Sequence, residues 1–340
     1  MKKLLPLLLL LLLTGCGKKS EPSTSGGELE KFVVALDYFP NADHAPLYAA
    51  QASGEFERAG LAVEFVTPPD PAAPLRLLVG GRVDLALTYE PELLLARDKG
   101  TSLVAVGALV QKPLTSLMAI EGSGVQSVSD LEGKTVGTAG ISYQTAYLET
   151  ILKAANVPVD SVERVDVGFN LVPAMLTGKV DATLGAFWNY EGTDLELRQR
   201  NPTILRMESL GVPTYNELVF ATEPDALTSE QSSRIRRFLQ AVARGANQVR
   251  DDPAGAVEAL LDANDDLDPA LQAAVVEVTA DVFLPADAKR PFGFQDLADW
   301  NEYASWMAEN GLIGSDQDGE DAVTNEFLPG QGLAANTAEP

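Results

Sequence analysis

Two short segments combine aromatic rings with carboxylates, and each directly follows an apolar run. The first is Asp37-Tyr38-Phe39, and the second is Phe187-Trp188-Asn189-Tyr190-Glu191. A carboxylate accepts hydrogen bonds from amines, and an aromatic side chain stacks on a flat ring. We therefore expect Asp37 with Tyr38, and Glu191 with Trp188, to bind a flat ligand that carries N–H donors. The alternative interpretation is structural, with Asp37 capping the next turn and the aromatic rings filling the core.

Two further segments are weaker candidates. Tyr89-Glu90 repeats the pairing of an aromatic ring with a carboxylate at the end of an expected strand, although both side chains would also suit the core. Residues 137–143 end a strand and open a helix, so backbone N–H groups near Gly140 are placed to bind a ligand acceptor or an anion. Gly133-Lys134-Thr135 is similar to the end of a phosphate-binding loop, but its first glycine would have to stand at Val128. The segment is therefore not a nucleotide-binding loop.

The elements around these segments follow an α/β rhythm, which indicates βαβ units and a mostly parallel sheet. In a first unit the expected strands are 32–37, 62–66, 83–88 and 103–110, and the expected helices are 44–56, 73–80 and 91–99. After a turn-rich stretch at 121–130 the rhythm restarts, with strands at 135–138, 162–167 and 182–187 and helices at 145–155 and 171–178. The sequence therefore predicts two α/β units.

An internal echo supports two similar lobes. Residues 75–87 and 173–184 both read as a helix that ends in Gly and a basic residue, followed by Val-Asp and a small, apolar strand. The glycine suits a left-handed helix C-cap, and the basic residue suits the helix dipole. Because only four positions align, two unrelated helix-to-strand turns remain an alternative.

The last third of the chain is largely helical, with expected helices at 229–251, 254–262, 269–282 and 294–310. We expect one lobe to combine residues 31–117 with 221–325 and a second lobe to hold residues 118–220. Extended crossings at 115–120 and 216–221 would join them, and 326–340 would be a disordered tail. A cleft between two lobes is a common place for a ligand.

Composition excludes several classes of function. The 340 residues carry 49 Asp and Glu against 25 Lys and Arg, a net charge of −24, which repels nucleic acid. With one cysteine, Cys16, and one histidine, His44, the chain can form no internal disulfide and has little material for a transition-metal site. We expect no metal, no cofactor and no nucleic-acid partner.

The first thirty residues predict export and a lipid anchor. Met1-Lys2-Lys3 is basic, residues 4–13 are apolar, and Leu13-Thr14-Gly15-Cys16 resembles a bacterial lipobox. The apolar run is too short to span a bilayer, which needs about 20 residues. We expect residues 1–15 to be a signal peptide, Cys16 to carry the lipid, and residues 16–30 to form a flexible tether, leaving the protein on the extracytoplasmic face of the membrane.

The N-terminal third resembles a known family. Residues 36–48, LDYFPNADHAPLY, are similar to the signature of the family that joins bacterial binding proteins for thiamine pyrimidine precursors to the eukaryotic enzyme making that pyrimidine. Further matches lie at 54–56, 60–61, 68–71, 81–84, 89–91 and 94–97, and the likeness thins after about residue 220. With a lipobox in front, the chain looks like the substrate-binding component of an ABC importer with a type II periplasmic-binding-protein fold.

The resemblance implies a monomer that closes two lobes over a small heterocycle and delivers it to a permease and its ATPase subunits. An aminopyrimidine, with its exocyclic amine beside ring nitrogens, suits the carboxylates and aromatic rings described above. Carboxylates at the cleft argue against a sulfonate or nitrate, whereas riboflavin stays open. The residues that we expect to bind the ligand are Asp37, Tyr38, Phe39, Asn41, His44, Tyr89, Glu90, Gly140, Trp188, Tyr190 and Glu191.

Two other interpretations of the chain stay open: an enzyme that makes the pyrimidine, and a lipoprotein that serves only as a scaffold. The eukaryotic enzymes of the family use a histidine near the position of His44 as a source of pyrimidine atoms and need a cysteine-rich iron motif, which a chain with only Cys16 lacks. His44 is therefore expected either to line the cleft or to support the start of the helix. The third interpretation is an acidic lipoprotein that serves only as a surface scaffold.

Overall fold

The computed structural model describes residues 28–315 and 318–331. The predicted signal peptide, the predicted lipidation site Cys16 and the tether up to residue 27 lie outside the described residues. Within the described ranges, no helix is both long and apolar enough to cross a membrane.

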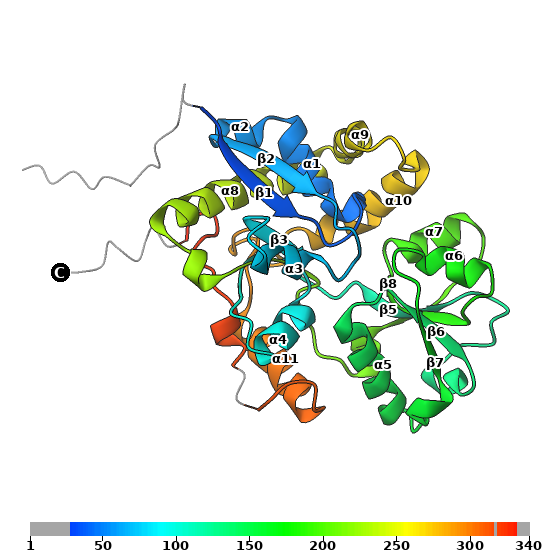
Figure 1. Cartoon of the computed structure of the whole chain (residues 1–340). Helices are drawn as coiled ribbons and strands as arrows, with labels where there is room; N and C mark the ends of the chain where they lie inside the picture. Colours follow the sequence, from blue (N-terminus) through cyan, green and yellow to red (C-terminus); the bar gives the residue numbers. More distant parts are fainter. Residues whose placement is uncertain (1–27, 316–317, 332–340) are drawn as a thin grey trace, which may run out of the picture.

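The first lobe contains a five-stranded sheet in the order β2-β1-β3-β10-β4. Figure 1 labels the first three of these strands. β1 pairs in parallel with β2 and β3, whereas β10 runs antiparallel between β3 and β4. Every residue of β3, β4 and β10 is buried, which explains why these strands read as continuous apolar runs. The bounds are β1 Glu30–Ala35, β2 Leu61–Val66, β3 Leu85–Thr88, β4 Val104–Val110 and β10 Leu218–Thr222.

The second lobe repeats this plan, with the order β7-β6-β8-β5-β9. In each sheet the antiparallel strand next to the edge, β10 or β5, is the first strand after the chain crosses from the other lobe. The structure therefore confirms the expected fold class of two α/β lobes. The bounds are β5 Thr115–Ala119, β6 Thr135–Thr138, β7 Glu163–Asp166, β8 Ala182–Phe187 and β9 Thr203–Arg206.

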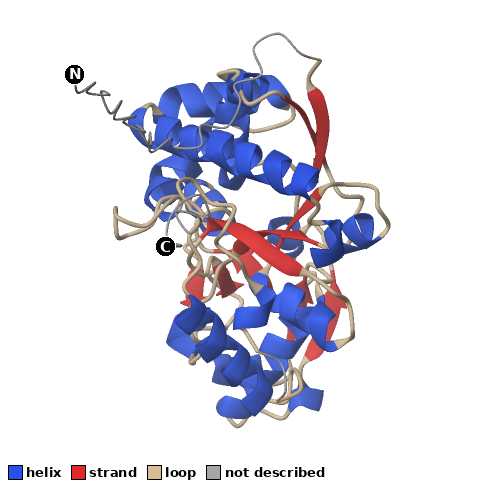
Figure 2. Ribbon diagram, turned by 90° about the vertical axis from the view of Figure 1, so that its left-hand side faces the viewer, coloured by secondary structure: helices blue, strands red, loops and turns tan. Residues whose placement is uncertain are grey.

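Helices cover both sheets (Figure 2). The first lobe begins with α1 Ala45–Ala52, α2 Glu55–Arg58, α3 Pro74–Val79 and α4 Glu90–Asp98. The second lobe has α5 Ser142–Ala154, α6 Leu171–Leu176 and α7 Glu191–Leu197. The C-terminal helices return to the first lobe, where α8 packs against α1 and α2. They are α8 Ser229–Asp251, α9 Pro253–Ala263, α10 Pro269–Thr279 and α11 Leu297–Glu309.

The helix expected at 44–56 is divided in the structure. A 3-10 turn, η1, covers Ala42–His44, α1 ends at Ala52, and α2 starts after Gly54. Gly54 has a φ of 71°, a left-handed conformation that an α-helix does not continue through. The prediction of one helix over 44–56 is therefore wrong, because Gly54 separates two helices.

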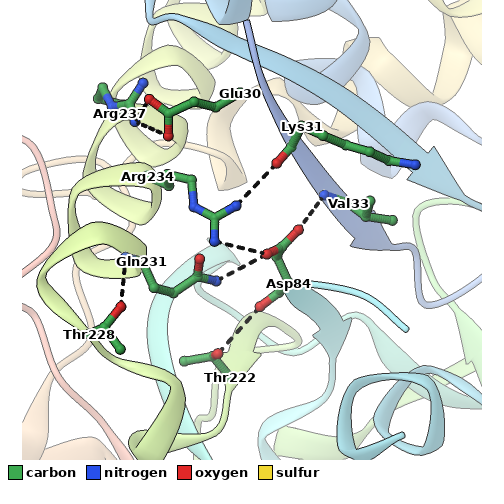
Figure 3. Close-up of polar contacts among 9 residues, drawn as sticks. All are labelled: Glu30, Lys31, Val33, Asp84, Thr222, Thr228, Gln231, Arg234 and Arg237. Atoms are coloured by element: carbon green, nitrogen blue, oxygen red, sulfur yellow. Dashed lines mark hydrogen bonds and ion pairs between the residues drawn. The ribbon is translucent and has the colours of Figure 1, made fainter. Parts of the chain in front are cut away.

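The internal echo corresponds to the same hydrogen-bond pattern in both lobes. The carboxylate of Asp84 accepts the N–H of Val33 in β1 at 2.8 Å (Figure 3). The backbone N–H of Asp84 also donates to the carbonyl of Val33. Asp181 makes the same two bonds to Thr135 at the start of β6, also at 2.8 Å. In each lobe, Val-Asp thus fixes a helix-to-strand turn onto the neighbouring parallel strand.

The crossings are shorter than the sequence suggests. Residues 115–119 and 218–222 pair fully within one sheet each, as β5 and β10. The expected lobe boundaries at 117/118 and 220/221 therefore fall inside strands. The chain passes between the lobes at residues 111–114 and 211–217, because the apolar residues on either side are taken into the sheets.

Glu217 ties the two crossings together. Its buried carboxylate accepts the backbone N–H groups of Leu114 and Thr115 at 2.6 and 2.8 Å. The hydroxyl of Thr115 donates to the same carboxylate at 2.9 Å, and that of Tyr215 at 3.1 Å. One side chain from the returning crossing thereby satisfies the backbone of the outgoing one.

The C-terminal segment is more ordered than expected. Val323 pairs with Ala105 of the first sheet, and both Phe327 and Leu328 are buried. Leu328 packs over Gly107, where a Cβ would lie 3.1 Å from its side chain. A disordered tail from residue 326 is therefore wrong for 326–331, because these apolar residues complete the first lobe; 332–340 lie outside the described residues.

Candidate functional site

A narrow cavity lies between the two lobes, and the space between atoms in and around it, open solvent included, is about 380 Å³. Its walls are built at the carboxyl ends of β1, β3, β6 and β8, the edge where open α/β sheets bind ligands. The first lobe contributes Asp37, Tyr38, Asn41, Asp43 and Tyr89. The second lobe contributes Ala139, Ile141, Gln144, Leu171, Gly185, Phe187, Tyr190 and Glu191.

Asp37 is held by two donors from its own lobe. Its Oδ1 lies 2.8 Å from Nε2 of His44, and its Oδ2 accepts the hydroxyl of Tyr89 at 2.8 Å. Nδ1 of His44 accepts the backbone N–H of Asn41, so the neutral ring carries its hydrogen on Nε2 and donates it to Asp37. Asp37 is thus fixed in orientation, and the remaining lone pairs of its oxygens are available to a ligand.

Asp43 is a second buried carboxylate in the cavity wall. Its Oδ1 accepts Nδ2 of Asn189, which comes from the second lobe, at 2.5 Å. Burial raises the pKa of Asp43 to about 7, and the bond from Asn189 and the proximity of His44 only partly oppose this. Near neutral pH this group is therefore present in both protonation states.

Glu191 is the third carboxylate, and it belongs to the second lobe. Its Oε2 accepts the backbone N–H of Phe187 at 2.7 Å. Burial raises the pKa of Glu191 to about 7. When protonated, the group offers one donor and one acceptor side by side, and when ionised it offers acceptors alone.

Tyr38 supplies an unpaired donor. Its hydroxyl oxygen is buried and has no hydrogen-bond partner among the described residues. Burial raises the pKa of Tyr38 far above its usual range, with the nearby carboxylates of Glu191 and Asp37 adding to the effect. The ring packs edge-on against Phe169 of the second lobe. A ligand acceptor in the cavity would satisfy this hydroxyl.

Gln144 and Gly185 shape the wall in the second lobe. Oε1 of Gln144 accepts the backbone N–H of Ala139 at 2.8 Å. The rest of its amide lies directly over Gly185, where a Cβ would be 2.2 Å from Nε2 of Gln144. Gly185 also has a φ of 112°, so glycine is needed both for its backbone and for the close approach of the amide.

A second, wider space, which we call the outer space, opens beside the cavity and shares Tyr190 and Glu191 with it. It lies between α6 and α7 of the second lobe and the segment that joins α9 to α10, and the space between atoms there, open solvent included, is about 1030 Å³. Phe39 and Phe169 are among its lining residues, and its one cationic lining residue, Arg198, is paired with Asp194. Because Asp266 and Asp268 also line it, the outer space is acidic.

The structure brings most of the predicted site residues together. Six of them line the cavity: Asp37, Tyr38, Asn41, Tyr89, Tyr190 and Glu191. Phe39 lines the outer space, and His44 lies behind Asp37 as a hydrogen-bond partner outside the cavity lining. The three others lie elsewhere.

Glu90, Trp188 and Gly140 are directed away from the cavity. Glu90 accepts the backbone and side-chain N–H groups of Asn216 in the returning crossing, both at 2.7 Å. The indole N–H of Trp188 donates to the carbonyl of Pro113 in the outgoing crossing at 3.1 Å. Gly140 faces Asp166, so only its neighbours in the chain reach the cavity.

Several wall residues were not singled out from the sequence. Asp43 stands inside the family-like segment 36–48, and Gln144 lies in the first turn of α5, next to the segment 137–143, so both were near a recognised signal. Leu171 and Gly185 carry no side-chain chemistry that a sequence pattern would mark. Within the described ranges, no three His, Cys, Asp or Glu residues are grouped to hold a metal ion.

Two α/β lobes with the same strand order, two crossings and a cavity between them define a periplasmic-binding-protein fold. A solved structure supports this class: the alkanesulfonate-binding protein SsuA from Xanthomonas axonopodis pv. citri bound to MOPS. It matches with a TM-score of 0.68 and 19% sequence identity, and the match covers 88% of this chain and 99% of that one. At this identity the likeness establishes the fold alone.

The family model described as NMT1/THI5 like matches residues 41–256, and the chain belongs to this family. A formylaminopyrimidine-binding protein of Halalkalibacterium halodurans is 32% identical over 321 residues, 94% of this chain and 96% of that protein. A 4-amino-5-hydroxymethyl-2-methylpyrimidine phosphate synthase of Legionella pneumophila is 26% identical over 306 residues, 88% of this chain and 92% of that protein. The family resemblance expected from the sequence is thus confirmed.

Proposed function

We propose that the protein is the lipid-anchored binding component of an ABC importer and captures an unphosphorylated thiamine pyrimidine precursor. The observation that carries the proposal is the cavity itself: three carboxylates and an unpaired tyrosine hydroxyl surround it, and no Lys or Arg lines it. The named binding function of the Halalkalibacterium halodurans relative supports the same ligand class.

The polar groups of the cavity complement an aminopyrimidine. The exocyclic amine would donate to Asp37 or Asp43, which keep unused lone pairs. A ring nitrogen would accept from the hydroxyl of Tyr38 or from protonated Glu191. The rings of Tyr89, Phe187 and Tyr190 would contact the faces and edges of the flat heterocycle.

The charge of the cavity disfavours anionic ligands. Moving a phosphate, sulfonate or nitrate into a buried site without a cation carries a large desolvation penalty, and nearby carboxylates add repulsion. The outer space is acidic as well, with its arginine already paired to Asp194. Riboflavin shares the flat ring, but its tricyclic system would have to extend from the cavity into the outer space.

An enzyme that makes the pyrimidine is the alternative from another class, and the Legionella pneumophila relative carries such a name. The environment of His44 supports binding instead. Both of its ring nitrogens are engaged, one by Asn41 and one by Asp37, and the side chain is buried. The cysteine-rich motif of the eukaryotic enzymes is also missing, since Cys16 is the only cysteine of the chain.

The proposal also includes a lipid anchor on Cys16 and the membrane partners of an importer. Lipidated Cys16 and the following polar residues would hold the folded lobes near the outer surface of the membrane. Metabolic labelling with a radioactive fatty acid should mark the wild-type protein and leave Cys16→Ser unmarked. Equal labelling of the two proteins would contradict the anchor.

A thermal-shift panel tests the ligand class. The chain from residue 16 with Cys16→Ser is refolded to remove carried-over ligand and is mixed with hydroxymethylpyrimidine, formylaminopyrimidine, thiamine, riboflavin, taurine or nitrate. A ligand at about 100 times its Kd stabilises the fold by about 2.7 kcal/mol. We expect stabilisation by the aminopyrimidines only. Stabilisation by riboflavin or taurine alone would show that the proposed ligand is wrong. No stabilisation by any compound of the panel would contradict the proposed binding function.

A further inference from the structure

One side chain of the second lobe is bonded directly to two elements of the first lobe. Asn189 follows β8, and its Nδ2 donates to Oδ1 of Asp43 at 2.5 Å and to Oγ1 of Thr279 at 2.8 Å. Asp43 lies in η1, and Thr279 is the last residue of α10. Both hydrogens of one amide nitrogen are therefore used to join the lobes.

The three side chains are shielded from water. Asn189 and Thr279 are 0% exposed, and Asp43 is 2% exposed. While Asp43 is ionised, the hydrogen bond to its carboxylate is about twice as strong as a neutral one, and a low-dielectric surrounding strengthens it further. Other side-chain bonds between the lobes include the buried hydroxyls of Tyr147 and Tyr303 on the side of α5 and α11, and longer bonds, both at 3.3 Å, join Ser142 to Glu92 and Gln272 to Tyr190.

Asn189 lies outside the lining of the cavity in which we expect the ligand. It follows Trp188 and precedes Tyr190 and Glu191 in the chain. Its partner Asp43 does line the cavity. Any opening of the lobes on this side must break both bonds of Asn189, and it must also release the carboxylate of Asp43 from its fixed orientation.

We propose that Asn189 is the latch of the closed state, a positioning residue that slows ligand release by binding Asp43 and Thr279 across the lobes. It touches no ligand; it holds the lobes together and orients one carboxylate that does face the ligand. The identity of the ligand rests on the proposed function, whereas the joining of the lobes does not.

Ligand kinetics give the first test, with formylaminopyrimidine as the probe and stopped-flow fluorescence as the readout. Asn189→Ala should raise the dissociation rate constant about tenfold or more, with an association rate constant within about threefold of wild type. Thr279→Val, which removes one acceptor at similar volume, should give a smaller rise. The matched control is Asn301→Ala, which removes an amide bonded to Glu320 at 2.8 Å within the first lobe. Equal dissociation rates for the Asn189 and Asn301 variants would overturn the latch.

A distance measurement tests the latch without relying on the ligand. Asp265→Cys and Glu196→Cys place nitroxide labels at exposed positions of the two lobes, in a chain from residue 16 that carries Cys16→Ser. We expect the short-distance population measured by pulsed electron resonance to fall in Asn189→Ala and to stay unchanged in Asn301→Ala. Identical distance distributions would overturn the latch. A shifted distribution without any aminopyrimidine binding would instead keep the latch and remove the proposed function.

Discussion

Nε2 of His44 donates to Oδ1 of Asp37 at 2.8 Å, and both side chains are buried. The direction of this bond follows from the other ring nitrogen, which accepts the backbone N–H of Asn41. His44 therefore positions the carboxylate from behind, while Tyr89 holds the second oxygen. In this arrangement a ligand meets Asp37, and the imidazole acts through it.

Asp37→Asn should weaken aminopyrimidine binding at least about a hundredfold, because the amide nitrogen cannot accept the hydrogen bond that His44 or Tyr89 donates to the carboxylate oxygen it replaces. Titration calorimetry measures the affinity, and the melting temperature reports folding. Asp70→Asn is the matched control, since Asp70 is a half-exposed aspartate bonded to Arg76 and is not part of the cavity lining. Binding that survives Asp37→Asn unchanged would contradict the role of Asp37.

Glu191 should make binding depend on pH. Burial raises its pKa to about 7, so the protonated form, which can donate to a ring nitrogen and accept from the amine, dominates below pH 7 and is lost above it. Affinity measured by calorimetry should therefore fall between pH 6 and pH 8.5. Glu191→Gln keeps a donor and an acceptor and should bind with a flatter pH profile, whereas Glu191→Ala should bind weakly throughout.

The difference between the wild-type and Glu191→Gln profiles isolates Glu191 from Asp43 and from the ligand, which titrate in both proteins. A wild-type affinity that rises with pH, or a Glu191→Gln profile as steep as that of wild type, would show that protonated Glu191 is not the form that binds.

Gly185→Ala should reduce binding by crowding the cavity. The new Cβ would lie 2.2 Å from Nε2 of Gln144, so the amide must move into the space that the ligand uses. We expect a loss of affinity of about tenfold or more, measured by calorimetry. Gly133→Ala is the control, because Gly133 also has a positive φ, of 74°, but has no neighbouring atom within 4 Å of the added Cβ. Equal affinities for the two variants would contradict the tight packing over Gly185.

Glu90 should lower stability as pH rises. Burial raises its pKa to about 8, and its Oε1 has no hydrogen-bond partner in the described part of the chain. The favourable protonated state is complete below the ordinary pKa of about 4.5 and is lost as pH rises through 8. Glu90→Gln should therefore raise the free energy of unfolding at pH 8.5 by about 1 kcal/mol or more and change little at pH 5.

Chemical denaturation at the two pH values measures this effect, with exposed Glu196→Gln as the control. Because burial also raises the pKa of Glu217 to about 7, a weaker pH dependence should remain in Glu90→Gln. A variant that is less stable than wild type at pH 8.5 would show that ionised Glu90 is needed at the crossing.

Local patterns were sufficient for most of the fold. Apolar runs located β1 to β4 and β6 to β8 but not β9, and the Val-Asp echo at Asp84 and Asp181 corresponds to one repeated hydrogen-bond pattern. The errors occurred where distant segments decide the outcome. Residues 115–119 and 218–222 look like connections in sequence, but they are strands because each meets a sheet built from other parts of the chain.

Only part of the candidate site was predictable from the sequence. Strand ends marked Asp37, Tyr89 and Glu191, because the carboxyl edge of a parallel sheet gathers such residues. Neighbours in sequence point differently, however: Tyr89 faces the cavity, while Glu90 bonds to the crossing at Asn216. Contacts between lobes, such as Asn189 with Asp43, depend on how the two lobes meet, which no local pattern records.

The most direct test of the central claim is a pair of calorimetric titrations of the refolded chain, one with hydroxymethylpyrimidine and one with its phosphate ester. A cavity lined by Asp37, Asp43 and Glu191 and by no cationic side chain predicts saturable binding to one site for the unphosphorylated compound. The phosphate ester should bind at least about a hundredfold more weakly, because its charge would be buried without a counterion. Tighter binding of the phosphate ester, or no heat with either compound, would contradict the account.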